Sequence, residues 1–304
     1  MERESAVAPV WGTSDLTLGL PGGVFRCAGL SESQVEVLEP RFGAWRVGRQ
    51  PDVHIEVRRA PQSSFDLRTV SGEVSTFERA FDADRVQLSG FDLLAVIERE
   101  SLDAVLLTPV DGALASSVGT PDPRFLDAFE NLLRVLCAYR CLRQGGALLH
   151  SSGVLTERGV HLFIGPSGAG KTTVARLSQE RGLGVLSDDI NLVLPADGAG
   201  SFAQRLPFAG ELGNGLPARP GDCGVVLGLH RLVQGPRHEL RALSGGSGLA
   251  ALLGSCPFVN SDPFALDRLI ANLEPLQDLV TELSFRRDAD FWQLLSPSRQ
   301  EVLV

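Results

Sequence analysis

Short runs in which apolar and polar residues alternate fill the chain between Gly19 and Thr108. Alternation at every second position is typical of half-buried β-strands, and the Pro and Gly residues between the runs are typical of turns. The pattern predicts a β-rich N-terminal domain over residues 1–120, in which no catalytic motif is visible. The predicted strands are 35–38, 45–47, 53–57 and 91–97.

A longer periodicity begins after residues 109–123, which are rich in Gly, Ser and Pro and are interpreted as a linker. From Arg124 to Gln144 apolar residues recur at steps of three and four, which predicts an amphipathic helix that ends at Gly145 and Gly146. The residues on its apolar face are Phe125, Phe129, Leu132, Leu133 and Leu136.

The second half of the chain mixes buried-strand and helix patterns, which predicts a second domain over residues 121–304. Together with the β-rich first domain, this order gives an α/β fold class, α+β overall. The predicted strands are 147–150, 160–164, 184–186, 190–194 and 279–285, and the predicted helices are 172–181 and 263–272.

Composition excludes several classes of protein. Hydrophobic residues make up 43% and charged residues 21% of the 304 positions, which excludes a disordered chain. The net charge of −9 argues against a nucleic-acid-binding surface over the whole fold. No apolar run approaches the roughly 20 residues of a membrane helix, and no secretory signal is visible. The five cysteines include no Cys-x-x-Cys pair. A cytoplasmic protein with reduced thiols is therefore expected.

The chain contains a single lysine, Lys171, among its 28 basic residues. A preference for Arg is typical of a GC-rich genome, and Arg replaces Lys on most surfaces. Arg cannot replace Lys where a compact ammonium on a flexible stem is needed. The lone lysine therefore indicates a position at which chemistry overrules composition.

Lys171 lies in a segment that fits the P-loop pattern at every fixed position, between an apolar strand and a helix. Glycines let the backbone bend around a phosphate, and the start of the helix adds a positive dipole end. The alternative is a glycine-rich turn without a ligand. The predicted nucleotide-binding residues are Gly165, Pro166, Ser167, Gly168, Ala169, Gly170, Lys171, Thr172 and Thr173.

Two adjacent carboxylates, Asp188 and Asp189, end a short apolar strand seventeen residues after Lys171. A P-loop needs a carboxylate at the end of a neighbouring strand to hold Mg²⁺, and a second one can accept a proton from an attacking hydroxyl. His150 ends another apolar strand, one hairpin before the loop, and can lie beside the phosphates. A solvated turn for the aspartates and a structural role for the histidine are the alternatives.

The order of His150, the loop beginning at Gly165 and the Asp188–Asp189 pair resembles the catalytic domain of HPr kinase/phosphorylase. That family phosphorylates a serine of a small carrier protein, and its P-loop fold is similar to that of phosphoenolpyruvate carboxykinase. Residues 147–194 look most like HPr-kinase-like proteins encoded beside peptide-modification genes, some of which are similar to kinases acting on a serine of a precursor peptide.

The resemblance implies a role for each matching residue. Lys171 and the loop backbone would hold the phosphates, while Thr172 and Asp188 would serve Mg²⁺. Asp189 would be the general base on the acceptor hydroxyl, tuned by His150. The roles of Asp188 and Asp189 could be exchanged. The N-terminal half does not match the family, which leaves the carrier-protein substrate, the usual hexamer and the reverse reaction without support.

Two further charged candidates lie outside the matching segment. The family's glycine-bearing signature after the Asp pair is not found, but Glu211 lies in about the right place and is a candidate second metal contact. A solvated Glu in a flexible loop is an equal alternative. Arg286 and Arg287 are interpreted as a solvated basic dipeptide, with contact to a phosphate or an acidic substrate as the alternative.

These observations predict an ATP-dependent kinase that transfers the γ-phosphate to a hydroxyl, with ATP favoured over GTP and Mg²⁺ as cofactor. The expected partner is a peptide or protein carrying an acceptor serine, presented with the help of the N-terminal domain. No nucleic acid or membrane partner is expected, and homo-oligomerisation stays open. A small-molecule kinase and a nucleotide-dependent regulator without transfer are the alternative functions.

Overall fold

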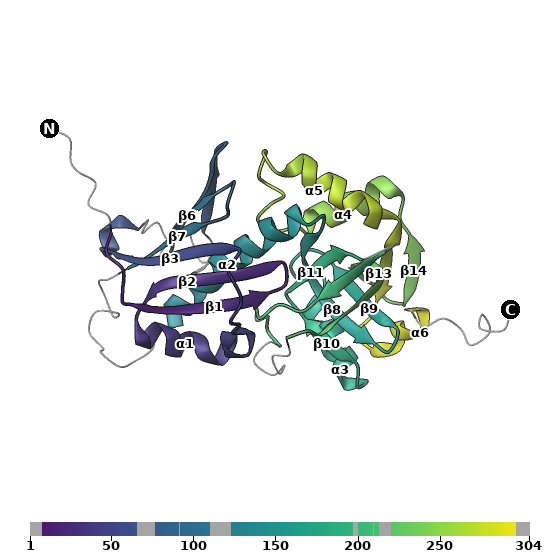
Figure 1. Cartoon of the computed structure of the whole chain (residues 1–304). Helices are drawn as coiled ribbons and strands as arrows, with labels where there is room; N and C mark the ends of the chain where they lie inside the picture. Colours follow the sequence, from purple (N-terminus) through teal and green to yellow (C-terminus); the bar gives the residue numbers. More distant parts are fainter. Residues whose placement is uncertain are drawn as a thin grey trace. The chain divides into compact units, whose positions relative to one another are not determined.

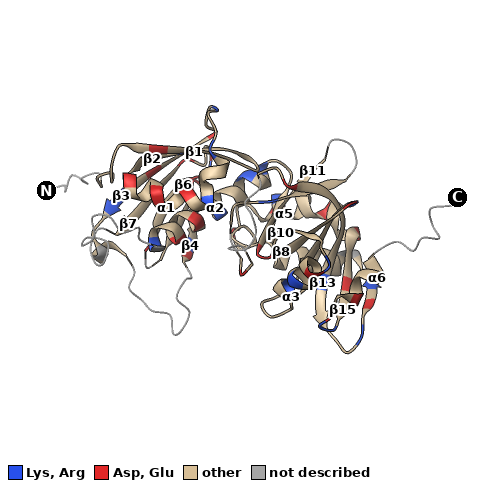
Figure 2. Cartoon of the chain, turned by 90° about the horizontal axis from the view of Figure 1, so that it is seen from below, with Lys and Arg blue, Asp and Glu red and all other residues tan. Residues whose placement is uncertain are grey.

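The protein has a mixed α/β fold with two β-sheets and several helices in a computed structural model (Figure 1). The structure describes residues 8–65, 77–90, 92–109, 123–196, 200–208, 210–212 and 220–295. The chain divides into two compact units, Met1–Arg140 and Cys141–Val304, and each unit contains one of the sheets. Acidic and basic residues are interspersed in both units (Figure 2). Within the described part of the chain, no helix has the length and apolar character needed to cross a membrane.

The first unit contains a seven-stranded sheet in the order β1-β2-β3-β7-β6-β5-β4. Strand β3 pairs in parallel with β2 and β7, and the other neighbours are antiparallel. The strands are β1 (Ser14–Leu20), β2 (Gly23–Leu30), β3 (Val53–Ala60), β4 (Glu78–Phe81), β5 (Arg85–Ser89), β6 (Leu94–Glu98) and β7 (Ala104–Pro109). The helical segments of this region are α1 (Glu32–Phe42), η1 (Gly43–Trp45) and η2 (Gln62–Ser64).

The division between the units lies inside helix α2 (Pro123–Arg143), directly after Arg140. This is later in the chain than the predicted boundary at residue 120. The helix itself confirms the prediction for 124–144. The Phe129 ring packs edge-on against Phe42 of α1, with 5.6 Å between the ring centroids. Near the other end, Arg140 Nε donates to the Gly22 carbonyl over 2.8 Å. Most of α2 therefore belongs to the first unit, while 110–122 lies outside the described residues.

Two predicted strands of the first unit are wrong. Residues 35–38 lie in α1, where Ser31 accepts from the Gln34 amide and the Gln34 side chain accepts from the Ser31 amide. This capping box starts a helix whose buried residues Gln34, Leu38 and Phe42 are four apart. Residues 45–47 form the end of η1 and a single bridge rather than a strand. The strand predicted at 53–57 is confirmed in β3, and the strand of 91–97 is β6, with Phe91 itself outside the description.

The second unit contains an eight-stranded sheet in the order β10-β8-β11-β12-β13-β15-β14, and β9 joins it between β8 and β13. Strand β13 pairs in parallel with β9 and β15, and the remaining pairs are antiparallel. The strands are β8 (Ala147–Thr156), β9 (Gly159–Ile164), β10 (Gly184–Ser187), β11 (Ile190–Pro195), β12 (Ser201–Gln204), β13 (Cys223–Gln234), β14 (Glu239–Ala242) and β15 (Val280–Phe285).

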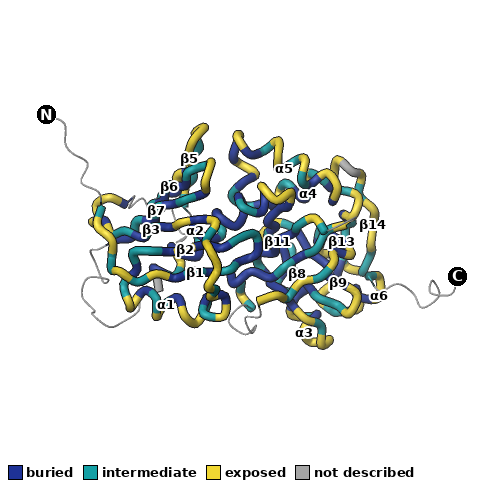
Figure 3. The backbone as a smooth tube through the Cα atoms, in the orientation of Figure 1, coloured by how far each residue is buried: buried dark blue, intermediate teal, exposed yellow. Residues whose placement is uncertain are grey.

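Most of the predicted elements of this unit are confirmed. The predicted helices correspond to α3 (Lys171–Glu180) and α5 (Leu266–Leu273), although α5 begins later than predicted. Figure 3 shows the long strands β8, β9 and β11 as largely buried. Elements of this unit that were not predicted are β12, β13, β14, α4 (Gly245–Gly254), η4 (Glu274–Leu279), η5 (Ala289–Phe291) and α6 (Trp292–Leu295).

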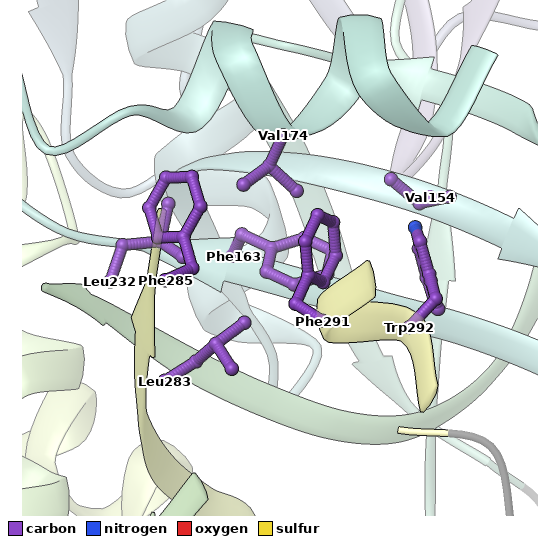
Figure 4. Packing of buried hydrophobic residues seen from close by; sticks show 8 residues of the cluster. All are labelled: Val154, Phe163, Val174, Leu232, Leu283, Phe285, Phe291 and Trp292. Atoms are coloured by element: carbon purple, nitrogen blue, oxygen red, sulfur yellow. The ribbon is translucent and has the colours of Figure 1, made fainter. Parts of the chain in front are cut away.

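A hydrophobic cluster holds α3 against the sheet (Figure 4). Val174 points down from the helix toward Phe163 of β9, and Trp292 lies beside them. The indole Nε1 of Trp292 donates to the Ser178 hydroxyl of α3 over 3.0 Å. Both sides of the loop between β9 and α3 are therefore anchored in one core. The cluster consists of Val154, Phe163, Val174, Leu232, Leu283, Phe285, Phe291 and Trp292.

Candidate functional site

The predicted phosphate loop joins the end of β9 at Ile164 to the start of α3 at Lys171. Gly168 and Gly170 adopt φ angles of 78° and 106°, which side chains with a Cβ rarely tolerate. A Cβ on Gly170 would also lie only 2.6 Å from the Phe285 ring. Glycine is therefore required at Gly170 both for its backbone conformation and for the close approach of β15.

The ammonium of Lys171 lies inside this loop. Its Nζ donates to the carbonyl oxygens of Gly165 and Pro166 over 2.8 Å and 3.0 Å. Burial lowers the pKa of Lys171, while the charge of Asp189 acts in the opposite direction. The two carbonyls converge on one small cation, a geometry that a planar guanidinium does not reproduce. The local structure thus gives a physical reason for the only lysine of the chain.

Asp188 is a buried carboxylate that directly follows β10. Its Oδ2 accepts the backbone N–H of Leu212 over 3.2 Å, while its Oδ1 is buried without a hydrogen-bond partner in the described residues. Burial raises the pKa of Asp188, although the Leu212 amide and the Thr172 hydroxyl lower it. Gly210 packs against the carboxylate so closely that a Cβ there would lie 2.2 Å from Oδ1.

Asp189 and His150 form a contact between neighbouring strands. His150 was predicted at the end of a strand but lies inside β8, which continues to Thr156. It lies opposite Ile190 of β11 in the antiparallel register, and its Nδ1 is 3.0 Å from Asp189 Oδ1. The Ser187 hydroxyl accepts the backbone N–H groups of Asp189 and Ile190 over 3.1 Å and 3.2 Å, which fixes the turn between β10 and β11. The Asp189 side chain remains 19% exposed, so it reaches the surface beside an imidazole that is 42% exposed.

These groups converge on one cavity of about 370 Å³ in the second unit. Of the predicted site residues, Gly165, Pro166 and Ala169 do not line it. Glu211 lines it and is exposed there, and its role as a second metal contact stays a prediction. The predicted residues that line the cavity are His150, Ser167, Gly168, Gly170, Lys171, Thr172, Thr173, Asp188, Asp189 and Glu211.

Three polar residues of the cavity wall were absent from the predicted site. Arg176 lies one turn along α3 from Thr172, so helical spacing from the loop was a signal for it. Gln234 ends β13 and donates from Nε2 to the Gly168 carbonyl over 2.7 Å. Arg287 follows β15 and lines the cavity, which favours phosphate contact over the solvated dipeptide of the sequence interpretation.

The residues present fit a magnesium ion shared with a phosphate group. Among the described residues no group of three His, Cys, Asp or Glu side chains is arranged to hold a metal on its own. Mg²⁺ does not need such a cage, because it is commonly bound by one or two carboxylates together with phosphates and water. The unpartnered Oδ1 of Asp188 and the nearby Thr172 hydroxyl are oxygen donors of this kind.

Comparison with known proteins does not assign the chain to a family. No protein-family model matches the chain, and no curated protein sequence matches it at a significant level. The chemistry of the site is therefore argued from its geometry. A buried ammonium in a glycine loop, a buried carboxylate with a free oxygen and a carboxylate–imidazole pair all face one cavity. Such a set can bind a polyphosphate and accept a proton.

Proposed function

We propose that the protein is a Mg²⁺-dependent phosphotransferase that moves the γ-phosphate of ATP to a hydroxyl group, with GTP the less favoured nucleotide. The observation that carries the proposal is the His150–Asp189 pair, which faces the same cavity as Lys171 and its loop. A protein that only binds nucleotide needs the loop but has no use for a general base. The pair therefore favours transfer over a purely regulatory role.

Each residue has a defined task in this proposal. The loop amides, Lys171 and the start of α3 bind the phosphates. Asp189 accepts the proton of the acceptor hydroxyl as its oxygen attacks the γ-phosphorus and the bond to ADP breaks. His150 orients the Asp189 carboxylate. A Mg²⁺ ion held by Asp188 and Thr172 would neutralise charge on the phosphates.

The two aspartates differ in ways that support this division of roles. The Asp188 side chain is buried, lies near Thr172 and keeps an unpartnered oxygen. Asp189 is more exposed and contacts the imidazole of His150. A metal ligand benefits from a fixed, desolvated position, whereas a base must reach an incoming hydroxyl. We therefore assign the metal to Asp188 and the proton to Asp189.

The acceptor class rests on the resemblance to HPr kinase. That resemblance covers residues 147–194 and favours a serine of a peptide or protein. It also favours a P-loop domain of the HPr kinase/phosphoenolpyruvate carboxykinase type for the second unit. A small-molecule hydroxyl would use the same phosphate loop and the same base. The acceptor therefore has to be identified by experiment.

Phosphorus NMR of the full chain with ATP and Mg²⁺ tests the proposal. The panel should contain serine-bearing peptides, whole-cell peptide extracts and small hydroxyl compounds, each against a sample without acceptor. We expect the γ-phosphate signal to fall while ADP and a phosphomonoester signal grow together. The Lys171→Ala variant is the control for contaminating kinases. Binding of ATP with unchanged spectra across the panel would favour the regulatory alternative.

A further inference from the structure

Strand β9 carries the phosphate loop, and its two neighbours in the sheet are β8 and β13. The β8 side, with β11 beyond it, supplies His150 and Asp189. The β13 side, with β15 beyond it, supplies Gln234 and Arg287. The loop is therefore flanked on one side by the carboxylate–imidazole pair and on the other by an amide and a guanidinium. The proposed function uses only the first flank.

The second flank is attached directly to the loop. Gln234 pairs with Phe285 in the parallel register of β13 and β15, and its side-chain amide donates to the Gly168 carbonyl over 2.7 Å. The Phe285 ring lies against Gly170, where a Cβ would come within 2.6 Å of it. Arg287 follows Phe285 by two residues. These contacts place the start of the Arg287 turn against the Gly168–Gly170 half of the loop.

Asp288 fixes the turn that presents Arg287. Its Oδ1 is 2.6 Å from His238 Nε2 and also accepts the backbone N–H of Asp290 over 3.1 Å. The backbone N–H of Asp288 donates to the Arg286 carbonyl over 2.8 Å. The guanidinium of Arg286 is hydrogen-bonded to Asp288 as well. The neighbouring arginine is thus held in an ion pair, while the turn itself is kept in one conformation.

Arg287 is different from Arg286. Its guanidinium has no hydrogen bond or ion pair within the described ranges, and it lines the cavity that contains Lys171. Within the described residues, the charged side chains that line the cavity are Lys171, Arg176, Arg287, Asp188, Asp189 and Glu211, three of each sign. Without Arg287 the carboxylates of this described set would outnumber its cations, although the cavity has to accept a polyanion. A guanidinium matches phosphate oxygens with two parallel N–H donors.

We propose that Arg287 binds the terminal phosphates of the nucleotide from the β13–β15 flank and makes the site prefer a triphosphate to a diphosphate. This inference rests on the proposed nucleotide-dependent function of the same cavity. The preference follows from position, because Arg287 lines the same cavity as Lys171, and the lysine of a P-loop reaches the β- and γ-phosphates. The terminal phosphate is the part of ATP that ADP lacks.

The test compares Arg287→Ala with Arg286→Ala in the full chain. Both variants lose one positive charge, one residue apart, but only Arg287 lines the cavity. Binding of ATP, ADP and AMP in the presence of Mg²⁺ is measured by calorimetry, and thermal melting checks the fold. Hydrogen bonds to charged groups contribute about 1.5–3 kcal/mol, so we expect Arg287→Ala to weaken ATP binding by roughly 10- to 100-fold. ADP binding should weaken less, and Arg286→Ala should bind ATP within about threefold of the unmodified chain.

Arg287→Lys adds a second readout, because it keeps the charge and removes the planar fork. We expect its ATP affinity to lie between those of Arg287→Ala and the unmodified chain. Equal losses for Arg286→Ala and Arg287→Ala would overturn the inference, and so would unchanged ATP affinity in Arg287→Ala with weaker binding of the acceptor. If Arg287→Ala loses ATP affinity but no acceptor is ever phosphorylated, the inference stands and the kinase proposal fails. A chain that does not bind ATP at all would overturn both.

Discussion

The two units of the protein are built from similar elements but differ in what they bury. Both contain a mixed β-sheet and helices, and both have an extensive hydrophobic core. The described part of the first unit buries three polar or charged residues, Gln34, Thr108 and Glu130. The described part of the second unit buries twelve, which are Ser151, Ser152, His161, Lys171, Ser178, Ser187, Asp188, Asn191, Arg205, His230, Ser255 and Asp262.

The buried polar residues of the first unit serve the fold. Gln34 closes the capping box of α1, Thr108 accepts the indole N–H of Trp11 over 2.9 Å, and Glu130 pairs with Arg134 one turn along α2. Each therefore has a local partner that offsets the cost of its burial. These contacts stabilise a sheet and two helices, and they assemble no chemical site.

Both units contain buried side-chain atoms without a hydrogen-bond partner among the described residues. Examples are Trp45 Nε1 in the first unit and Asp188 Oδ1 in the second, and of these two only Asp188 lines the cavity. Asp188 keeps an oxygen without a hydrogen-bond partner, and Lys171 is held by carbonyl oxygens instead of a carboxylate. An unpartnered buried oxygen costs stability, commonly by about 1–3 kcal/mol. Such a cost is tolerated where the group has a ligand to bind. The comparison teaches that the two units differ less in the number of unsatisfied polar groups than in where these groups lie. In the second unit such a group lies at a cavity that can hold a ligand.

The largest effect is expected at Lys171. Lys171→Ala removes the only ammonium of the loop, so we expect weaker ATP binding and loss of detectable transfer. Lys171→Arg should also fail, because the guanidinium does not fit between the carbonyls of Gly165 and Pro166. Single-turnover transfer and calorimetric ATP binding measure both effects. Near-normal transfer by the Arg variant would contradict our explanation of the single lysine.

The next effect concerns the pair of Asp189 and His150. Asp189→Asn keeps the shape of the side chain and removes its capacity to accept a proton, so ATP binding should persist. Transfer should fall by about 10²–10⁴-fold, the usual size of a general-base effect. His150→Ala should reduce transfer in the same direction because the two side chains are in contact.

A double-mutant cycle on the single-turnover rate decides whether the pair acts as one unit. We expect the combined variant to lose little more than Asp189→Asn alone, because both changes affect one proton transfer. Losses that multiply would show that His150 acts elsewhere. If Asp189→Asn abolishes ATP binding instead, the metal and base roles of Asp189 and Asp188 are exchanged.

A smaller effect is expected on metal dependence. Removing even an outer-shell partner of a metal commonly costs about 10- to 100-fold in affinity, so Asp188→Ala should weaken Mg²⁺-dependent ATP binding by at least this much. Gly210→Ala should act similarly without removing a charge, because its methyl group would lie 2.2 Å from Asp188 Oδ1. Titration of ATP with and without Mg²⁺ isolates the metal-dependent part. The same affinity of Asp188→Ala and the unmodified chain at every Mg²⁺ concentration would remove Asp188 from the metal site.

Much of the second unit was predictable because its signals are local. The apolar runs of β8, β9 and β11, the loop around Lys171 and the Asp188–Asp189 pair can each be recognised in a few consecutive residues. The first unit was less predictable, since Val35 and Val37 alternate like a strand while Ser31 and Gln34 start a helix. The capping box determines that this segment is helical, and the strand-like alternation of the valines masks that signal in the sequence.

The second flank of the loop could not be predicted for a different reason. Gln234 and Arg287 are far apart in the sequence, and only the parallel pairing of β13 with β15 brings them to the same loop. Gly224 and Gly228 interrupt the apolar pattern of β13 and conceal the strand. Register between distant strands depends on the packing of the whole sheet, and no short motif encodes it.

The smallest expected effect is on stability, and it concerns two of the buried polar residues, His161 and His230. His161 Nδ1 and His230 Nε2 lie 2.9 Å apart in the second unit, and His230 Nδ1 is 2.8 Å from the Thr281 hydroxyl. Trp292 packs edge-on against His161. Burial lowers the pKa of His161 to about 4, and burial together with the neighbouring His161 lowers the pKa of His230 to about 3.

Both histidines are therefore neutral in the folded chain at pH values where an unfolded chain has begun to protonate them. Stability is complete above the ordinary histidine pKa of about 6.5 and falls as the pH is lowered toward 4. Each histidine adds at most about 1.4 kcal/mol per pH unit to this fall. We therefore expect His161→Phe to reduce the pH dependence of unfolding between pH 6.5 and 4.5.

Urea unfolding followed by tryptophan fluorescence at several pH values measures this dependence. Acidic residues titrate in every variant, so the difference between each variant and the unmodified chain isolates the histidine. His161→Phe will also change stability at pH 7 through packing against Trp292, and this offset is separated from the slope because it does not vary with pH. An unchanged slope in His161→Phe would mean that the buried imidazoles are not what makes the second unit sensitive to acid. The contrast between the units would then rest on the cavity residues alone.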